Sequence, residues 1–128
     1  MTTDRMILLV EDEPHIAEAI RFILTRAGWL VAVEPDGAAV LGRIRTLRPR
    51  VVVLDVMLPG RSGLDILTDL RTDPAFSTLP VLMLTARGHG RDREAAEQAG
   101  ATAFLAKPFA NADVLAAVER IAAADQAG

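Results

Sequence analysis

The chain has 128 residues, of which 51% are apolar, and its 14 basic and 17 acidic side chains give a formal net charge of −3. This size and apolar content predict a single folded domain over 1–128, with its core at about 6–122 and a tail or linker start at 123–128. The absence of cysteine excludes disulfides and thiolate chemistry, the mild acidity argues against a nucleic-acid surface, and apolar runs of about five residues are too short to cross a membrane.

Strand-like and helix-like patterns alternate along the whole chain. Short apolar runs predict buried strands, and apolar residues at helical spacing, bounded by Asp, Asn, Gly and Pro, predict the helices between them. In chain order we expect strand 6–10, helix 14–27, strand 30–33, helix 38–48, strand 51–55, helix 62–72, strand 80–84, helix 88–100, strand 103–106 and a last helix capped by Asn111.

Five strand–helix units with short connections predict an α/β fold. We expect a (βα)5 doubly wound, five-stranded parallel sheet with helices on both faces. The expected strand order is the flavodoxin-like 2-1-3-4-5, which places the first and third strands side by side. The helix at 88–100 offers the core only Ala95, Ala96 and Ala99, so we expect it to be loosely held.

Polar residues stand at the ends of four predicted strands. Glu11 and Asp12 follow the first strand, Asp55 ends the third, and Thr85 and Lys107 follow the fourth and fifth. In an open α/β sheet the carboxyl ends of the strands border one crevice, where ligands bind. We therefore expect these five side chains to share one pocket.

The three acidic residues are candidate metal ligands. Glu11 and Asp12 could instead act only as caps of the following helix, where acidic groups interact favourably with the helix dipole. Asp55 on the neighbouring strand favours a metal site, because an acid after four buried apolar residues is costly without a partner. Hard oxygen ligands suit Mg²⁺, with Mn²⁺ as a substitute.

The lysine at the end of the fifth strand precedes a proline. A Lys107-Pro108 bond permits the cis form, which would turn the lysine toward the pocket. A lysine there fits a point charge next to a phosphoryl oxygen.

Several spaced motifs together point to a known family. In order along the chain they are Glu11-Asp12, Asp55, Leu84-Thr85-Ala86 and Lys107-Pro108-Phe109. This constellation resembles the receiver domain of two-component response regulators, over about 6–122. Each motif is weak alone, and their order and spacing make the signal strong.

The resemblance implies a role for each matching residue. Asp55 would accept a phosphoryl group from a phosphohistidine of a partner kinase. Asp12 and Asp55 would bind Mg²⁺, with Glu11 acting directly or through water and the backbone carbonyl of Met57 as a further ligand.

The resemblance also implies how the phosphoryl group is bound and sensed. Lys107, the hydroxyl of Thr85 and the backbone N–H of Ala86 would contact it. Thr85 and Phe104 would then form a switch that changes the surface of the fourth helix, fifth strand and fifth helix. Phe104 replaces the tyrosine common in the family, and a plain core aromatic is the alternative reading.

The implied partners are a sensor histidine kinase or a histidine phosphotransfer protein, together with an output domain or downstream protein that the sequence does not identify. We expect a cytoplasmic monomer, or a weak phosphorylation-dependent dimer, without direct nucleic-acid or membrane binding. It would not be an enzyme, beyond catalysing at most its own phosphorylation and dephosphorylation.

Two other function classes fit the sequence less well than this interpretation. A phosphatase of the haloacid-dehalogenase type would need a second aspartate where Met57 stands. A flavodoxin-like nucleotide binder would need a Gly- or hydroxyl-rich loop where Glu11-Asp12-Glu13 would repel phosphate. The arginines at 43, 45, 48 and 50 are interpreted as a solvated helix face or, less simply, a docking surface.

Overall fold

Five parallel strands form one sheet in the order β2-β1-β3-β4-β5, which confirms the predicted topology. The computed structural model describes residues 3–85 and 90–127, with side chains described for 5–85 and 93–124. The strands are β1 (Thr3–Val10), β2 (Leu30–Glu34), β3 (Pro49–Asp55), β4 (Val81–Thr85) and β5 (Ala103–Ala106). The helices are α1 (Pro14–Arg26), α2 (Val40–Leu47), α3 (Gly63–Thr72), α4 (Gly90–Ala99) and α5 (Asn111–Ala127), with a 3-10 turn, η1 (Gly37–Ala39).

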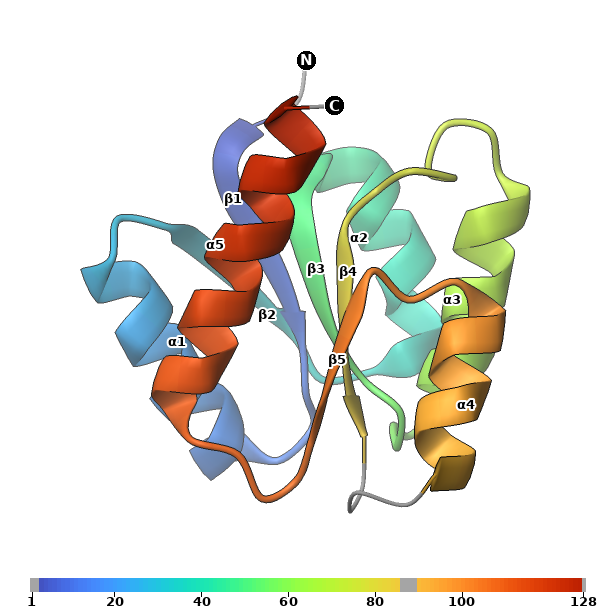
Figure 1. Cartoon of the computed structure of the whole chain (residues 1–128), viewed down its shortest axis with the longest axis horizontal. Helices are drawn as coiled ribbons and strands as arrows, with labels where there is room; N and C mark the ends of the chain where they lie inside the picture. Colours follow the sequence, from blue (N-terminus) through green and yellow to red (C-terminus); the bar gives the residue numbers. More distant parts are fainter. Residues whose placement is uncertain (1–2, 86–89, 128) are drawn as a thin grey trace.

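The helices cover both faces of the sheet, with α1 and α5 on one side and α2, α3 and α4 on the other (Figure 1). Successive strand residues point to opposite faces. In β1, for example, Ile7 and Leu9 pack under α1 and α5, whereas Leu8 and Val10 pack under α2 and α3. The sheet thus separates two apolar cores, and its central strands are buried on both faces.

Local sequence sets where the first helix begins and ends. The Glu13 carboxylate accepts a hydrogen bond from the His15 amide at 2.9 Å, and Pro14 occupies the first helical position, where its missing N–H costs nothing. The chain leaves the helix through Gly28, whose φ of +97° favours glycine.

Several predicted boundaries differ by one to three residues, as in β1, β3 and β4, and two helix starts differ in kind. Residues 37–39 form a 3-10 turn before α2 begins at Val40, so the predicted single helix is divided. Asn111 lies inside the first turn of α5 rather than before it. The capping bond is made instead by the Asp113 carboxylate, which accepts from the Ala110 amide at 3.2 Å.

The helix α4 has few buried side chains, as its composition predicts. Ala96 is fully buried, whereas Ala95 and Ala99 are only half-buried. An unpredicted contact holds its carboxyl end, because the Arg71 guanidinium donates to the Gly100 carbonyl at 2.8 Å and to the Phe76 carbonyl at 3.0 Å.

A search of the described helices finds none with the length and apolar character needed to span a bilayer. The strand ends that carry the candidate residues lie at the edge of the sheet opposite the start of β1 and the carboxyl end of α5 (Figure 1).

Candidate functional site

The polar residues named from the sequence lie at one edge of the sheet. Val10 pairs with Leu54, Asp55 with Leu84, and Thr85 with Ala106, so these strands end at nearly the same level. Glu11 and Lys107 follow the paired residues directly. The strand order therefore gathers side chains that are up to 96 residues apart in the chain.

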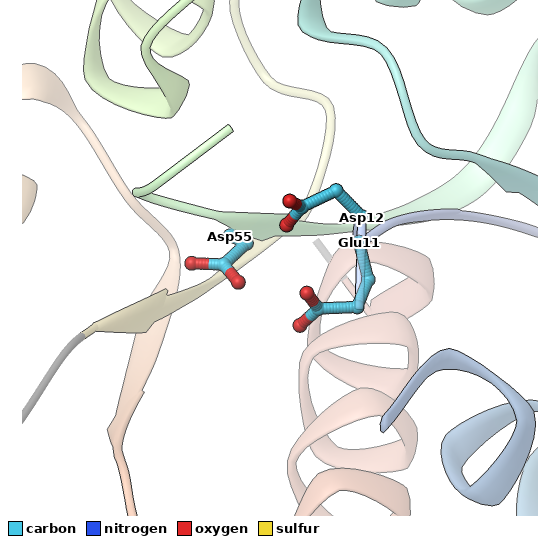
Figure 2. Close-up of side chains that lie close together, drawn as sticks. All are labelled: Glu11, Asp12 and Asp55. Atoms are coloured by element: carbon cyan, nitrogen blue, oxygen red, sulfur yellow. The ribbon is translucent and has the colours of Figure 1, made fainter. Parts of the chain in front are cut away.

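Three acidic side chains form a cluster at this edge. Glu11, Asp12 and Asp55 each offer a carboxylate oxygen, and these oxygens lie within 4.8 Å of one another. Figure 2 shows the carboxylate of Asp12 directed toward that of Asp55, with the Glu11 carboxylate beside them. Glu11 and Asp55 are each only 2% exposed, whereas Asp12 is exposed and opens the cluster to solvent.

A lysine partly neutralises this negative charge. The Lys107 Nζ lies 2.8 Å from Asp55 Oδ2 and 3.7 Å from Glu11 Oε1, and the Lys107–Pro108 peptide bond is cis. Burial of the ammonium lowers its pKa, but the hydrogen bond and charge of Asp55 and the charge of Glu11 outweigh burial and raise the pKa of Lys107 above its usual value. Lys107 is therefore fully charged at neutral pH.

Glu11 is the most perturbed acid of the cluster. Burial of its carboxylate and its contact with Asp55 raise the pKa of Glu11 from 4.5 to about 7, against the opposing effects of the Glu13 amide and Lys107. Its Oε2 accepts a hydrogen bond from the Glu13 amide at 3.1 Å. Its buried Oε1 has no hydrogen-bond partner among the described residues.

This donor set fits a small divalent cation. A buried carboxylate oxygen without a hydrogen bond is costly, and a metal ion would remove that cost. Carboxylate oxygens from two or three side chains, with one side open to water, are typical of Mg²⁺ sites. Glu11, Asp12 and Asp55 would hold the ion.

The carboxylate of Asp55 is fixed through both oxygens. Oδ1 accepts a hydrogen bond from the Met57 amide at 3.0 Å, and Oδ2 accepts from Lys107. The Met57 side chain is 68% exposed. A hollow of about 420 Å³, lined by Asp12, Val56, Met57, Leu58 and Ser62, lies next to the cluster.

Gly63 was not among the site residues predicted from the sequence, although it bears directly on the position of Asp55. A Cβ at this position would lie 2.1 Å from the Asp55 carbonyl oxygen, and the Gly63 amide donates to the Val56 carbonyl at 3.0 Å. Only glycine allows the start of α3 to approach the strand end this closely. A glycine directly after the helix-capping Ser62 was the available signal.

The two residues named for the switch lie on neighbouring strands. Thr85 is 2% exposed, and its hydroxyl donates to the Leu105 carbonyl at 3.4 Å. Phe104 is half-buried, and the guanidinium of Arg93 from α4 lies 4.6 Å from the centre of its ring. Ala86, named for its backbone N–H, lies outside the described residues.

Comparison with known families gives a direct match. Residues 7–119 match the family model described as the response regulator receiver domain. The chain is 43% identical over 109 residues to the probable transcriptional regulatory protein TcrX of Mycobacterium tuberculosis, covering 85% of this chain and 46% of that protein. It is 38% identical over 117 residues to the DNA-binding response regulator MtrA of Mycolicibacterium smegmatis, covering 91% of this chain and 50% of that one. The chain thus spans about half the length of these curated relatives.

Solved structures show the same fold. A putative response regulator from Chloroflexus aurantiacus superposes with a TM-score of 0.89 at 35% identity, covering 93% of this chain and 98% of the other. The receiver domain of a sensor histidine kinase from Pseudomonas aeruginosa superposes with a TM-score of 0.85 at 30% identity, covering 93% and 98% of the two chains. That structure has a magnesium ion coordinated in its active-site cleft.

Proposed function

This chain belongs to the response regulator receiver family, and on that premise we propose that Asp55 is the residue that accepts the phosphoryl group. As a receiver domain of two-component response regulators it is a phosphorylation-activated switch and a regulatory domain. One observation carries the assignment of Asp55. Its buried carboxylate contacts a lysine at 2.8 Å inside a cluster of three acids.

The chemistry needs few protein groups. In the transfer, a carboxylate oxygen of Asp55 bonds to phosphorus while the bond from phosphorus to the donor histidine nitrogen breaks. Such reactions depend on positioning and on neutralising charge on the phosphoryl oxygens. The Met57 amide and Lys107 already orient the two carboxylate oxygens.

Phosphorylation adds negative charge to an acidic pocket. Asp55 would change from one negative charge to about two, by analogy with other phosphorylated side chains. Lys107 is placed to compensate part of this charge. Mg²⁺ bound by Glu11, Asp12, Asp55 and the Met57 carbonyl would supply the rest, and Mn²⁺ would serve as a substitute.

The switch would begin at Thr85. Its hydroxyl now donates to the Leu105 carbonyl, and it must leave that acceptor to donate to a phosphoryl group on Asp55. The backbone N–H of Ala86 would join it there. Phe104 would then move into the space that Thr85 vacates, which alters the surface of α4, β5 and α5.

The partners follow from the family and remain part of the proposal. A sensor histidine kinase or a histidine phosphotransfer protein would supply the phosphoryl group. Because the relatives of twice this length are named as DNA-binding or transcriptional regulators, the output would be a separate domain or downstream protein. The domain itself would act in the cytoplasm without binding nucleic acid, and would catalyse no more than its own phosphorylation and dephosphorylation.

Incubation with acetyl phosphate and Mg²⁺, followed by intact-mass measurement, tests the assignment. We expect one phosphoryl group per chain, lost in D55N and retained in D65N, which changes an exposed acid on α3. Beryllofluoride with Mg²⁺ should likewise form one stable adduct per chain in the wild type. Undiminished phosphorylation of D55N, or of the wild type on another residue, would contradict the assignment.

A further inference from the structure

A third buried carboxylate lies next to the acidic cluster, in addition to those of Glu11 and Asp55. Glu34 is the last residue of β2, pairs with Val10 in the sheet, and is 8% exposed. Its backbone carbonyl accepts a hydrogen bond from the Glu11 amide at 3.3 Å. Its carboxylate is not one of the three that surround the candidate metal position, so its burial needs another explanation.

Both carboxylate oxygens of Glu34 are hydrogen-bonded. Oε2 accepts from the Asp36 amide at 3.0 Å, and Oε1 accepts from Arg43 of α2 at 3.2 Å. Burying a charge is unfavourable unless it is paired and hydrogen-bonded, and this carboxylate satisfies both conditions. The side chain thereby fixes the backbone where the chain turns from β2 toward α2.

That turn packs tightly against the turn after β3. The Gly37 amide donates to the Pro59 carbonyl at 3.0 Å, and a Cβ on Gly37 would lie 2.3 Å from the Arg61 carbonyl oxygen. Likewise, a Cβ on Gly60 in the turn after β3 would lie 2.3 Å from Asp36 Oδ1 in the turn after β2. The two turns are in backbone contact, so a displacement of one displaces the other.

The turn after β3 belongs to the segment that begins at Asp55. Met57, two residues before Pro59, donates its amide to Asp55 Oδ1. A hydrogen bond from the Gly63 amide to the Val56 carbonyl joins the two ends of this loop, at the start of α3 and directly after Asp55. The position of Met57 therefore depends on Asp55, on α3 and on the turn that Glu34 supports.

We propose that Glu34 is a positioning residue for the acidic site. Its carboxylate, paired with Arg43, holds residues 36–39 against residues 59–61 and so sets the backbone that follows Asp55. The inference rests on the proposed function, because the backbone it sets includes Met57, the expected source of a carbonyl ligand for Mg²⁺. Glu34 acts through other residues and does not touch the reacting atoms.

Two variants separate positioning from simple stabilisation. E34Q keeps the size of the side chain but loses its charge, and E34A removes the acceptors altogether. We expect E34A to weaken Mg²⁺ binding about tenfold, the lower end of the effect of removing groups that orient metal ligands, and E34Q to weaken it less. Calorimetric titration with MgCl₂ measures both affinities.

A control for loss of stability is V118A. Val118 of α5 is fully buried in the core on the other face of the sheet, so the change removes packing without touching either turn. We expect V118A to be destabilised by a cavity and yet to bind Mg²⁺ within about twofold of the wild type. In ¹⁵N–¹H spectra, E34Q should shift amides of residues 57–61 as well as those of 36–38, whereas V118A should leave both groups unchanged.

The outcomes are distinct. Wild-type Mg²⁺ affinity in folded E34A, or spectral shifts in E34Q confined to 34–38, would overturn the positioning role. If E34A does not fold, E34Q supplies both measurements. If the wild type itself binds no Mg²⁺, the proposed function fails, and the shifts at 57–61 in E34Q still decide whether Glu34 sets that backbone.

Discussion

Individual residues in the acidic cluster experience both charge repulsion and charge attraction. Glu11 and Asp55 repel each other, and Lys107 compensates only part of their charge. Burial of the Glu11 carboxylate, together with its contact with Asp55, raises the pKa of Glu11 to about 7 in the folded protein, while in the unfolded chain this pKa keeps its usual value near 4.5. From this shift we expect the proposed cation site to bind Mg²⁺ less tightly at low pH.

The raised pKa of Glu11 predicts a pH-dependent stability without metal. The folded state holds the Glu11 proton more tightly than the unfolded state, so stability is greatest below about pH 4.5 for this group and falls as pH rises from about 5 to 7. The full loss is on the order of 3 kcal/mol. Urea unfolding in EDTA, followed by fluorescence of the buried Trp29, measures it at each pH.

The E11Q variant isolates this contribution, since all other titrating groups remain. Its stability should fall less than that of the wild type between pH 5 and 7, and Mg²⁺ should restore stability to the wild type at pH 7.5. Parallel curves for the two proteins across this range would show that Glu11 titrates normally.

Gly63 gives a second prediction for a single residue. In G63A the new methyl group must displace the Asp55 carbonyl or the start of α3, and overpacking of this kind costs about 1–3 kcal/mol. Because Asp55 itself moves, beryllofluoride binding should weaken as well. Thermal unfolding and a beryllofluoride titration monitored by NMR measure the two effects.

Gly42 on α2 is the matched control, because a Cβ there meets nothing within 4 Å. G42A should stabilise the protein by about 0.5–1 kcal/mol, as alanine does in place of glycine within a helix, and should leave beryllofluoride binding unchanged. Equal behaviour of G63A and G42A would refute the close-approach argument.

Among the elements, α4 differs from the other helices in how it is held. Its described side chains include one fully buried residue, Ala96, whereas α3 buries Ile66, Leu67 and Leu70. Burial of a methyl group contributes far less than burial of a leucine. The contacts of Arg71 with Gly100 and of Arg93 with Phe104 then become a large part of what keeps α4 in place.

Hydrogen exchange should reveal this difference. Amides of α4 are expected to exchange at least tenfold faster than those of α3, through local opening that leaves the rest of the fold intact. Mass-spectrometric or NMR exchange at neutral pH, on the unphosphorylated protein, gives the rates. Exchange of α4 and α3 amides with one common free energy would mean that the two helices open together.

The extent to which elements could be predicted also varies. Strand positions followed from short apolar runs, because the central strands are buried on both faces and tolerate few polar residues. The division of the predicted helix 38–48 into η1 and α2 was missed; η1 is capped by Asp36, and Gly37 contacts the Pro59–Arg61 turn, which the sequence alone does not show. Arg43 was assigned to a solvated face because its partner, Glu34, lies on another element.

At the scale of the whole molecule, the strand order could be predicted because alternating units leave few arrangements open. That order brings Glu11, Asp12 and Asp55 together, and the structure shows their oxygens within 4.8 Å. Burial, hydrogen-bond partners and the perturbed pKa of Glu11 could not be predicted, because they depend on the positions of many atoms at once. The role of Glu34 could not be predicted for the same reason, whereas the position of Gly63 directly after the helix-capping Ser62 was a signal in the sequence.

Ligand binding at the acidic site should stabilise the entire fold. A ligand that binds only the folded state adds about 2.7 kcal/mol at one hundred times its dissociation constant. Beryllofluoride with Mg²⁺ should therefore raise the melting temperature by several degrees, and D55N should lose this increase. Differential scanning calorimetry with and without fluoride provides the comparison, and an unchanged melting temperature in the wild type would argue against binding.

The sheet divides the interior into two apolar layers, which share the strands of the sheet but are built from different side chains. One layer lies under α1 and α5, and the other contains α4 and Phe104. Substitutions that improve packing in the first layer alone should therefore raise the melting temperature of the protein. The layer that contains α4 and Phe104, on which the proposed switch depends, would keep its native packing.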